Sequence, residues 1–261
     1  MKIFILILLF LVAVTIFARS KPPPLIPSPT PQPNPTVSVS PVTSEIEVGE
    51  TVYRIYLQKI IAPDSIILID NFSQKELAST LFKSNNCNFG VNGGFYTKGN
   101  KPLGLFFTNG KWWEKIPSPN KLFNGYLYKT KAGSFNFDTT IPDTSSLEFV
   151  FQSGPIFTPT SKLAIIDDEP ARRILVGKTD SDEIYFVALT DVDNTNTGPL
   201  LADLPNIIKQ FNSSYPSIIH DSSFNILLNL DGGSASTFVT PNIKLSEITP
   251  VGSFLCGKQD Q

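Results

Sequence analysis

The amino-acid pattern of the chain changes at about Pro41, and this change constrains the fold more than any other feature. After it, β-branched and aromatic runs of five to eight residues alternate with clusters of Gly, Pro, Asn and Asp. That pattern is typical of short strands joined by turns. Before it, residues 22–41 hold nine of the chain's 22 prolines, and such a segment can neither form a helix nor pack a core. We therefore expect one strand-rich globular domain over residues 43–261.

Ten segments of this domain have strand character. They are 51–60, 65–70, 88–92, 103–108, 122–129, 148–152, 172–177, 183–190, 225–230 and 236–240. Two helices are predicted between them. The first spans 73–83, where Ser73 and Glu76 have the spacing of a capping box, and the second spans 204–211 with apolar residues at helical spacing. Hairpins interrupted by two helices predict an α+β fold with a mixed sheet.

The N-terminal residues have the features of an export segment and a spacer. An apolar run of 16 residues, 3–18, follows Lys2, which is typical of a signal sequence but also suits an uncleaved membrane anchor. Residues 1–19 are therefore read as signal or anchor, and 20–42 as a Pro-rich linker. The linker is either a spacer between membrane and domain or a tail with no role beyond its length. A signal sequence and an uncleaved anchor both predict an exported protein, secreted or membrane-anchored on the extracellular face.

Composition excludes several classes of function. A net charge of −2 gives no basic face for nucleic acid. A single histidine, His220, cannot build a multi-histidine metal centre, and it is read as a surface residue. Two cysteines, Cys87 and Cys256, cannot form a four-cysteine zinc site; whether they pair is left open. No cofactor is expected, with calcium at the oxygen-rich segment 191–196 as the alternative.

Three segments combine glycines with polar side chains at strand ends. They are 91–96 (VNGGFY), 151–155 (FQSGP) and 229–237 (NLDGGSAST). Each could be a plain turn, but the third carries more polar groups than a turn needs. A carboxylate at a strand exit followed by a glycine-rich hydroxyl loop is a common construction for a ligand site.

In their order and spacing, these segments and those between them resemble the phosphodiester glycosidase family. The residues that carry the resemblance are Asn92–Phe95, Pro102–Leu105, Asn109–Lys111, Gln152–Pro155, Arg173 with Gly177, and Leu228–Gly233. The resemblance runs from about Ile46 to Val251. The chain departs from the family's usual pattern at Ser234 and Ala235, which puts substrate choice more in question than catalysis.

Carried over by position, the resemblance implies a set of site residues. Asp231 and Arg173 would be catalytic, and the substrate-binding residues would be Asn92, Gly93, Gly94, Gln152, Gly232, Gly233, Ser236 and Thr237. The chemistry is consistent, because a guanidinium and glycine-rich amides suit the negative charge of a phosphodiester. Arg172 must point to the opposite side of its strand from Arg173, so its replacement is expected to do little.

The leading hypothesis is an exported monomeric hydrolase that cleaves the glycosidic bond between a sugar and phosphate, on cell-wall or capsule polysaccharide. Phosphate is a good leaving group, so one carboxylate could suffice where glycosidases usually need two. The alternative is a non-catalytic carbohydrate-binding module on a stalk, with Trp112 or Trp113 as a stacking platform. The sequence does not specify the sugar, the stereochemistry, or whether the C–O or the P–O bond breaks.

Overall fold

The strand β12 (Ile184–Asp191) is buried along almost its whole length. Alternate side chains enter two separate apolar clusters: Phe186 and Ala188 belong to one, whereas Val187 and Leu189 belong to the other. A strand buried on both faces is central to a sheet covered on both sides. This computed structural model describes residues 41–141 and 143–258, and all of them lie in one unit, Val39–Gln261.

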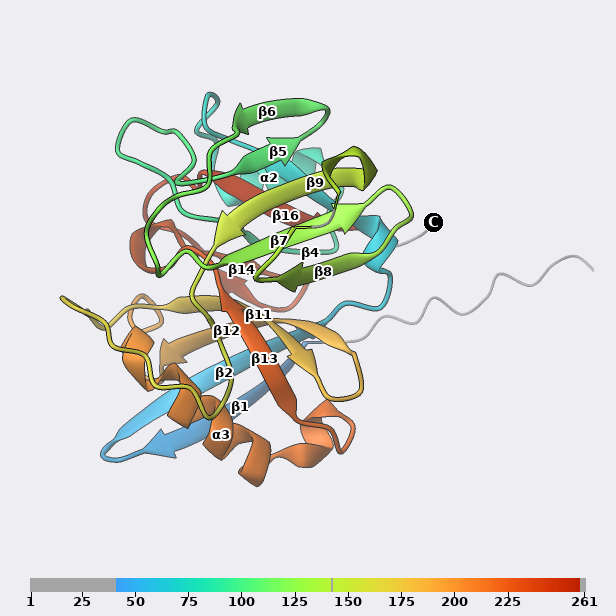
Figure 1. The fold of residues 1–261 in the computed structure, drawn as a ribbon. Helices are drawn as coiled ribbons and strands as arrows, with labels where there is room; N and C mark the ends of the chain where they lie inside the picture. Colours follow the sequence, from blue (N-terminus) through green and yellow to red (C-terminus); the bar gives the residue numbers. More distant parts are fainter. Residues whose placement is uncertain (1–40, 142, 259–261) are drawn as a thin grey trace, which may run out of the picture. The chain divides into compact units, whose positions relative to one another are not determined.

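β12 lies in the middle of a six-stranded antiparallel sheet, the first sheet. In spatial order its strands are β1 (Val42–Val48), β2 (Thr51–Lys59), β12, β11 (Arg173–Thr179), β13 (Phe224–Asn229) and β10 (Ile156–Phe157). The register places Val187 opposite Leu57 on one side and Leu175 on the other. Figure 1 shows β13 crossing from this sheet toward the other two.

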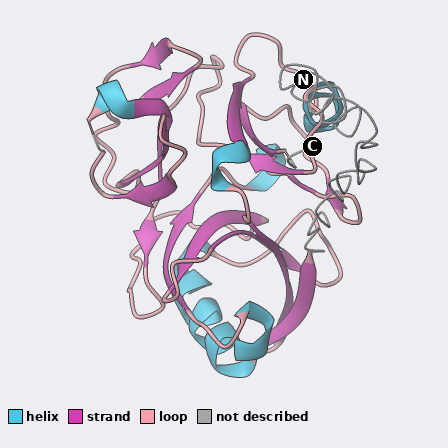
Figure 2. Ribbon diagram, turned by 90° about the vertical axis from the view of Figure 1, so that its right-hand side faces the viewer, coloured by secondary structure: helices cyan, strands magenta, loops and turns pink. Residues whose placement is uncertain are grey.

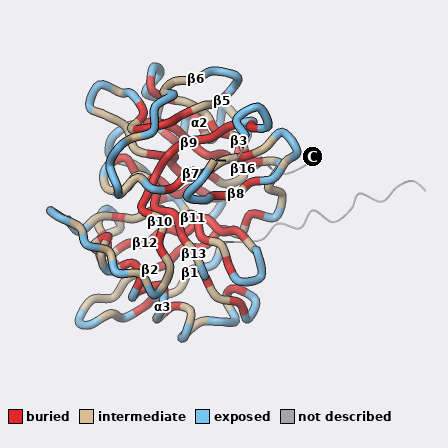
Figure 3. The backbone as a smooth tube through the Cα atoms, viewed as in Figure 1, coloured by how far each residue is buried: buried red, intermediate tan, exposed pale blue. Residues whose placement is uncertain are grey.

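Two five-stranded antiparallel sheets complete the β-structure. The second sheet has the order β15 (Lys244–Leu245), β14 (Phe238–Val239), β4 (Phe89–Asn92), β16 (Ser253–Gly257) and β3 (Ile66–Asp70). The third has the order β6 (Lys111–Glu114), β5 (Phe106–Thr108), β9 (Leu147–Ser153), β7 (Gly125–Thr130) and β8 (Phe135–Asp138). One apolar cluster joins all three sheets, and the buried segments of Figure 3 follow these strands.

The sheets are antiparallel throughout, so the predicted mixed sheet is wrong, whereas the strand-rich α+β class is confirmed. Each of the ten segments that were predicted as strands contains a strand, although β5 and β14 are shorter than expected. The prediction missed β1, β6, β8, β10, β15 and β16. Most of these are short, and β1 has charged, exposed side chains on alternate positions, so the density of apolar residues that marked the other strands is absent.

The helix α3 (Leu204–Ser214) covers the face of the first sheet that points away from the other two sheets. Its residues Leu204, Ile207, Ile208 and Phe211 are fully buried in the cluster that contains Leu175 and Val187. Figure 2 shows this helix against the outside of the curved sheet, at the bottom of the view. The helical spacing of these four residues therefore predicted the buried face correctly, and the helix continues to Ser214.

The other helix, α2 (Ala78–Ser84), begins five residues later than predicted. Ser73 and Glu76 form no capping box: the backbone N–H of Glu76 donates to Oδ1 of Asn71 at 2.9 Å. The carboxylate of Glu247 accepts from the backbone N–H of Ala78 at 2.6 Å and so caps the first turn from a distant part of the chain. Short-range sequence rules cannot identify such a cap.

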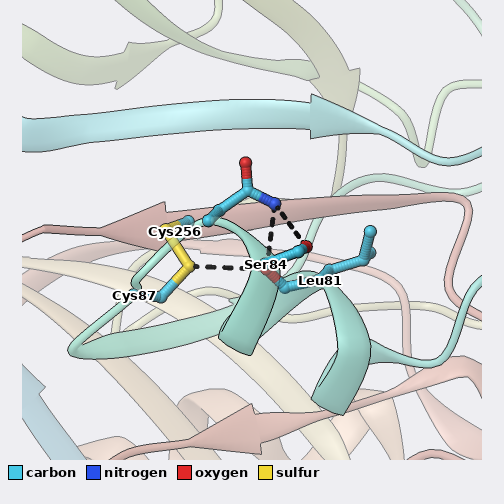
Figure 4. Close-up of a disulfide and its surroundings, with 5 residues drawn as sticks. Leu81, Ser84, Cys87 and Cys256 are labelled. Atoms are coloured by element: carbon cyan, nitrogen blue, oxygen red, sulfur yellow. Dashed lines mark hydrogen bonds between the residues drawn. A yellow bond between two sulfur atoms is a disulfide. The ribbon is translucent and has the colours of Figure 1, made fainter.

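Cys87 and Cys256 form a disulfide with their Cα atoms 5.5 Å apart. It joins the loop after α2 to strand β16, and Figure 4 shows it beside the end of the helix, where Cys87 lies near the carbonyl of Leu81. The bond closes a loop of 169 residues in sequence separation. The question that the sequence left open is therefore answered.

The sequence predictions for residues 1–19 and for nearly all of 20–42 lie outside the residues that the structure describes. Between Pro41 and Lys258, leaving aside residue 142, no helix has the length and hydropathy needed to cross a membrane.

Candidate functional site

Strand β13 delivers Asp231 to the place where the first and second sheets meet. The backbone N–H of Leu230 donates to the carbonyl of Ile174 at 2.8 Å, which continues the pairing with β11 for one residue beyond the strand. The next N–H, that of Asp231, donates to the carbonyl of Gly93 at 3.1 Å, just after β4. Two of the three sequence segments, 91–96 and 229–237, are thus joined through the backbone of Asp231.

Asn92 holds this junction together. Its side-chain amide nitrogen donates to the carbonyls of Asp231 at 2.8 Å and Gly93 at 3.1 Å, and its oxygen accepts from the N–H of Thr237 at 2.9 Å. The residue is 1% exposed. Because the protein itself uses these groups, Asn92 sets the position of Asp231 rather than offering its amide to a ligand.

Gly93 and Gly94 allow neighbouring strands to approach closely. A Cβ on Gly93 would lie 2.2 Å from Oγ of Ser253, and one on Gly94 would lie 2.8 Å from the ring of Phe151. The N–H of Gly93 donates to the carbonyl of Ser253 at 2.8 Å. Close packing between β4, β9 and β16 therefore explains both glycines, and the Gly93 amide is already engaged.

Gln152 at the end of β9 organises a loop. Its Oε1 accepts from the N–H groups of Ser118 at 2.6 Å and Leu105 at 3.3 Å, and its Nε2 donates to the carbonyl of Phe123 at 2.5 Å. The side chain is nearly fully buried. Its hydrogen bonds hold the 118–123 loop beside the strand ends.

The segment 151–155 also joins the other two. Oγ of Ser153 and the N–H of Gly154 both donate to the carbonyl of Asn229, at 2.7 and 3.0 Å, and Nδ2 of Asn229 returns a bond to the carbonyl of Gly154. The structure therefore brings together all three segments that the sequence singled out, around the end of β13.

The loop after Asp231 is fixed by its own hydroxyl groups. Gly233 has a φ of +61°, which favours glycine, and its N–H donates to the carbonyl of Arg172 at 3.0 Å. Oγ of Ser236 donates to the carbonyl of Gly233 at 2.5 Å, and Oγ1 of Thr237 to that of Leu245 at 2.9 Å. Both hydroxyl-bearing residues are fully buried.

Arg172 and Arg173 have different partners, as their alternation at the start of β11 predicts. The guanidinium of Arg172 is buried, and it donates to Oγ and the carbonyl of Ser236 and to the carbonyl of Ser246, all at 2.6–2.7 Å. It therefore supports the loop that follows Asp231. These buried hydrogen bonds make Arg172 unsuitable as the silent control that its place on the strand suggested, because its charge holds that loop.

Arg173 forms an ion pair with Asp168 at 3.2 Å, and each side chain is 11% exposed. Its Nε and Nη2 also donate to the carbonyls of Pro199 and Glu169. The remaining guanidinium nitrogen, Nη1, forms no hydrogen bond within the described residues. It lies 3.8 Å from the point where a side chain on Gly232 would begin. Arg173 thus borders the Asp231 loop from the side of β11.

A cavity of about 440 Å³ opens beside Asp231. Its lining residues are Lys75, Tyr96, Thr97, Lys98, Asn100, Asp231, Gly232, Ser234, Ala235, Thr249 and Pro250. Of the ten predicted site residues, only Asp231 and Gly232 line it. The other predicted residues lie behind or beside this surface, where they hold the backbone in place.

The carboxyl group of Asp231 is partly buried, and loss of solvation raises its pKa to about 7. A hydrogen bond from the N–H of Gly232, at 2.9 Å, acts weakly in the opposite direction. Burial also raises the pKa of Tyr96, with a smaller contribution from the charge of Asp231. A carboxyl group that holds its proton near neutral pH can serve as a general acid.

The sequence reasoning missed Tyr96, Lys75, Lys98 and Thr249. Tyr96 follows the Gly93-Gly94 pair closely, and its hydroxyl donates to the carbonyl of Pro250 at 2.7 Å. That position was inside the segment 91–96, so proximity to the glycines was the one available signal. The lysines lie on loops with no motif, and the sequence offers no sign that they meet Asp231.

Other conspicuous residues lie away from the cavity. Trp112 packs on Phe107 and Trp113 on Phe72, with ring centroids 4.8 and 5.2 Å apart. His220 is exposed, as expected, and its Nδ1 lies 3.2 Å from the carboxylate of Glu183. In the segment 191–196, Oδ1 of Asp191 accepts from two backbone N–H groups, and the described residues contain no cluster of three metal-ligating side chains.

The fold and the site together define a class of protein: an α+β domain of three antiparallel sheets with a partly buried carboxyl group at a glycine-rich strand exit. A model of the phosphodiester glycosidase family matches residues 85–256, and the chain belongs to this family. The sequence-based resemblance is therefore confirmed.

Solved structures show the same fold. The catalytic domain of zebrafish N-acetylglucosamine-1-phosphodiester alpha-N-acetylglucosaminidase, auto-inhibited by its pro-peptide, aligns with a TM-score of 0.64 and 15% identity, over 87% of this chain and 85% of that one. A hypothetical protein from Synechocystis aligns with a TM-score of 0.51 and 13% identity, over 82% of this chain and 61% of that one. No curated protein sequence matches the chain significantly. At these identities the likeness concerns the fold alone.

Proposed function

We propose that this protein hydrolyses the glycosidic bond between a sugar and the phosphate of a phosphodiester. The observation that carries the proposal is the carboxyl group of Asp231, with its pKa raised to about 7, at the wall of a cavity of about 440 Å³. Membership of the phosphodiester glycosidase family supports the same reaction class.

In the proposed reaction, protonated Asp231 donates its proton to the phosphate oxygen that is bonded to the anomeric carbon. The C–O bond breaks, its electron pair stays on that oxygen, and water adds to the resulting oxocarbenium-like carbon. The proton that the water loses replaces the one that Asp231 gave up, so the acid is restored. Among the described residues that line the cavity, Asp231 is the only carboxylate. One acid is chemically sufficient because the departing phosphate monoester is a good leaving group.

The residues behind the cavity keep this acid in place. Asn92 bonds the carbonyl of Asp231, and Arg172 holds the loop at Ser236. We assign Arg173 the role of phosphate anchor through Nη1, which lies next to Gly232. There the positive guanidinium would attract the negatively charged diester. Its ion pair with Asp168 fixes the orientation of the guanidinium.

We place the enzyme outside the cytoplasm, acting as a monomer on polysaccharides of the cell envelope. The disulfide between Cys87 and Cys256 supports an oxidising compartment, because such bonds persist there. The apolar segment 3–18 is the proposed export signal or anchor. The reaction as proposed needs no cofactor.

The alternative of a non-catalytic carbohydrate-binding module finds less support. That reading relied on an exposed tryptophan platform, whereas Trp112 and Trp113 are half-buried against other aromatic rings and do not line the cavity. A binding module would also gain nothing from an acid that titrates near neutral pH.

A panel of 4-nitrophenyl phosphodiesters of different sugars tests the proposal. We expect one or more to release sugar with the wild-type protein. Asp231→Asn should reduce turnover by about a hundredfold or more, because it keeps the shape but cannot donate a proton. Asp193→Asn, at an exposed position away from the cavity, is the matched control. Undiminished turnover in Asp231→Asn would show that another group is the acid, and binding of a sugar without hydrolysis of any diester by the wild type would favour the binding module.

A further inference from the structure

Two lysine side chains, Lys75 and Lys98, border the cavity of Asp231. Both residues are exposed, and neither forms an ion pair with any residue that the structure describes. Among the described lining residues, the one other charged group is Asp231 itself. The mouth of the cavity is therefore cationic, and more so when Asp231 carries its proton.

Lys75 is held on a braced loop. Its own N–H donates to the carbonyl of Asn71 at 3.0 Å. The side-chain amide of the buried Asn71 donates to the carbonyls of Glu76 and Val251, both at 2.8 Å. Since Val251 follows the cavity residue Pro250, these bonds fasten the lysine's loop to the cavity wall.

Lys98 lies in a separate hydrogen-bonded turn. The N–H of Thr97 donates to the carbonyl of Lys101 at 2.8 Å, and the N–H of Asn100 donates to the carbonyl of Thr97 at 2.8 Å. Tyr96 at the start of this turn is bonded to the carbonyl of Pro250. Both lysines are thus presented by backbone that is tied to the same segment of the wall.

We propose that Lys75 and Lys98 bind a phosphate group of the ligand whose sugar enters the cavity of Asp231; this rests on the proposed function. Two exposed ammonium groups, neither of them in an ion pair within the described residues, give the cavity a positive potential that suits a phosphate anion. Ammonium groups on flexible stems can follow a phosphate whose position varies with the attached group. Arg173, the proposed phosphate anchor beside Gly232, is not among the residues that line the cavity, so the two lysines are the cationic side chains of its lining.

Binding of inorganic phosphate to the full chain, followed by NMR titration, tests the proposal without requiring turnover. The wild-type protein should bind phosphate with shifts at the amides of Gly99, Ser234 and Thr249, and added salt should weaken the binding. The double variant Lys75→Ala/Lys98→Ala should bind about tenfold more weakly. Equal phosphate affinity in the double variant and the wild type, or no phosphate binding by the wild type, overturns the proposal.

Two matched variants separate charge from structure. Lys101→Ala removes an exposed lysine from the same turn that carries Lys98, outside the cavity lining, and should leave phosphate affinity unchanged. Lys75→Arg/Lys98→Arg keeps the positive charge and should retain most of the affinity. A loss of affinity in Lys101→Ala equal to that of the double variant would overturn the assignment.

Kinetics then distinguish this inference from the proposed function. With an active diester substrate, Lys75→Ala/Lys98→Ala should raise KM about tenfold at nearly constant kcat, and should leave KM for a neutral 4-nitrophenyl glycoside unchanged. Lysine-dependent phosphate binding by a protein that hydrolyses no diester would support the anion site while refuting the proposed function. Normal KM for diesters in the double variant would refute the anion site alone.

Discussion

At the scale of single residues, Asp231 links protonation to stability. Burial raises its pKa to about 7, whereas an aspartate in an unfolded chain titrates near 4. The folded state therefore binds this proton more tightly. The resulting stabilisation is fully present below about pH 4 and is lost as the pH rises through about 7, and it amounts to about 4 kcal/mol.

Asp231→Asn lacks this titration, so urea unfolding of both proteins at pH 4 and pH 8 checks the prediction. The free energy of unfolding of the wild type, relative to Asp231→Asn, should be lower at pH 8 than at pH 4 by up to about 4 kcal/mol. A difference between the two proteins that stays constant over this range would show that Asp231 has an ordinary pKa.

The two adjacent arginines should respond differently to replacement. Arg172→Ala leaves acceptors at Ser236 and Ser246 without a donor and should lower the free energy of unfolding by about 3 kcal/mol or more. Arg173→Ala should chiefly weaken the binding of diesters, by about 2 to 5 kcal/mol, with a smaller effect on neutral aryl glycosides. Denaturant unfolding and KM measurements on both variants separate the effects. A stable Arg172→Ala with raised KM would reverse the assignment.

The sequence located the segments that form the site more accurately than it assigned a role to each residue. Four predicted binding residues lie where the strands converge, but their side chains form hydrogen bonds with backbone groups: Asn92, Gln152, Ser236 and Thr237. A sequence pattern records that a polar residue is needed at a strand end but not which atom it faces. Lys75 was missed because only the folded chain brings its loop to Asp231.

At the scale of elements, the disulfide ties the loop after α2 to β16. Its sequence separation is 169 residues, and a loop of that size corresponds to a stabilisation of up to about 5 kcal/mol in the chain-entropy account. The double variant Cys87→Ala/Cys256→Ala should lose about 2 to 5 kcal/mol of unfolding free energy in guanidinium. A loss below about 1 kcal/mol would mean that the bond contributes little to folding.

The elements that the sequence predicted well are those whose burial is regular. β12 is a continuous apolar run, and α3 repeats its apolar residues at helical spacing. Each pattern therefore indicates a single type of secondary structure. The start of α2 was wrong because its cap comes from Glu247 and because Asn71 binds Glu76. Contacts between distant segments decide such boundaries, and no local pattern contains them.

At the scale of the whole molecule, every helix and strand of the described residues lies between Val42 and Gly257. A chain that lacks residues 1–40 should therefore fold, with a cooperative unfolding transition and a midpoint close to that of the full chain. Circular dichroism melting of both chains measures this. Loss of cooperativity on removing residues 1–40 would show that these residues contribute to the core.

The measurement that most directly tests the account is hydrolysis of an active 4-nitrophenyl sugar phosphodiester in ¹⁸O-labelled water, with wild type and Asp231→Asn side by side. We predict that the wild type releases 4-nitrophenyl phosphate and a sugar that carries the label, because the sugar C–O bond breaks. Asp231→Asn should be slower by about a hundredfold or more. Label in the phosphate product, or equal rates for the two proteins, would contradict the account.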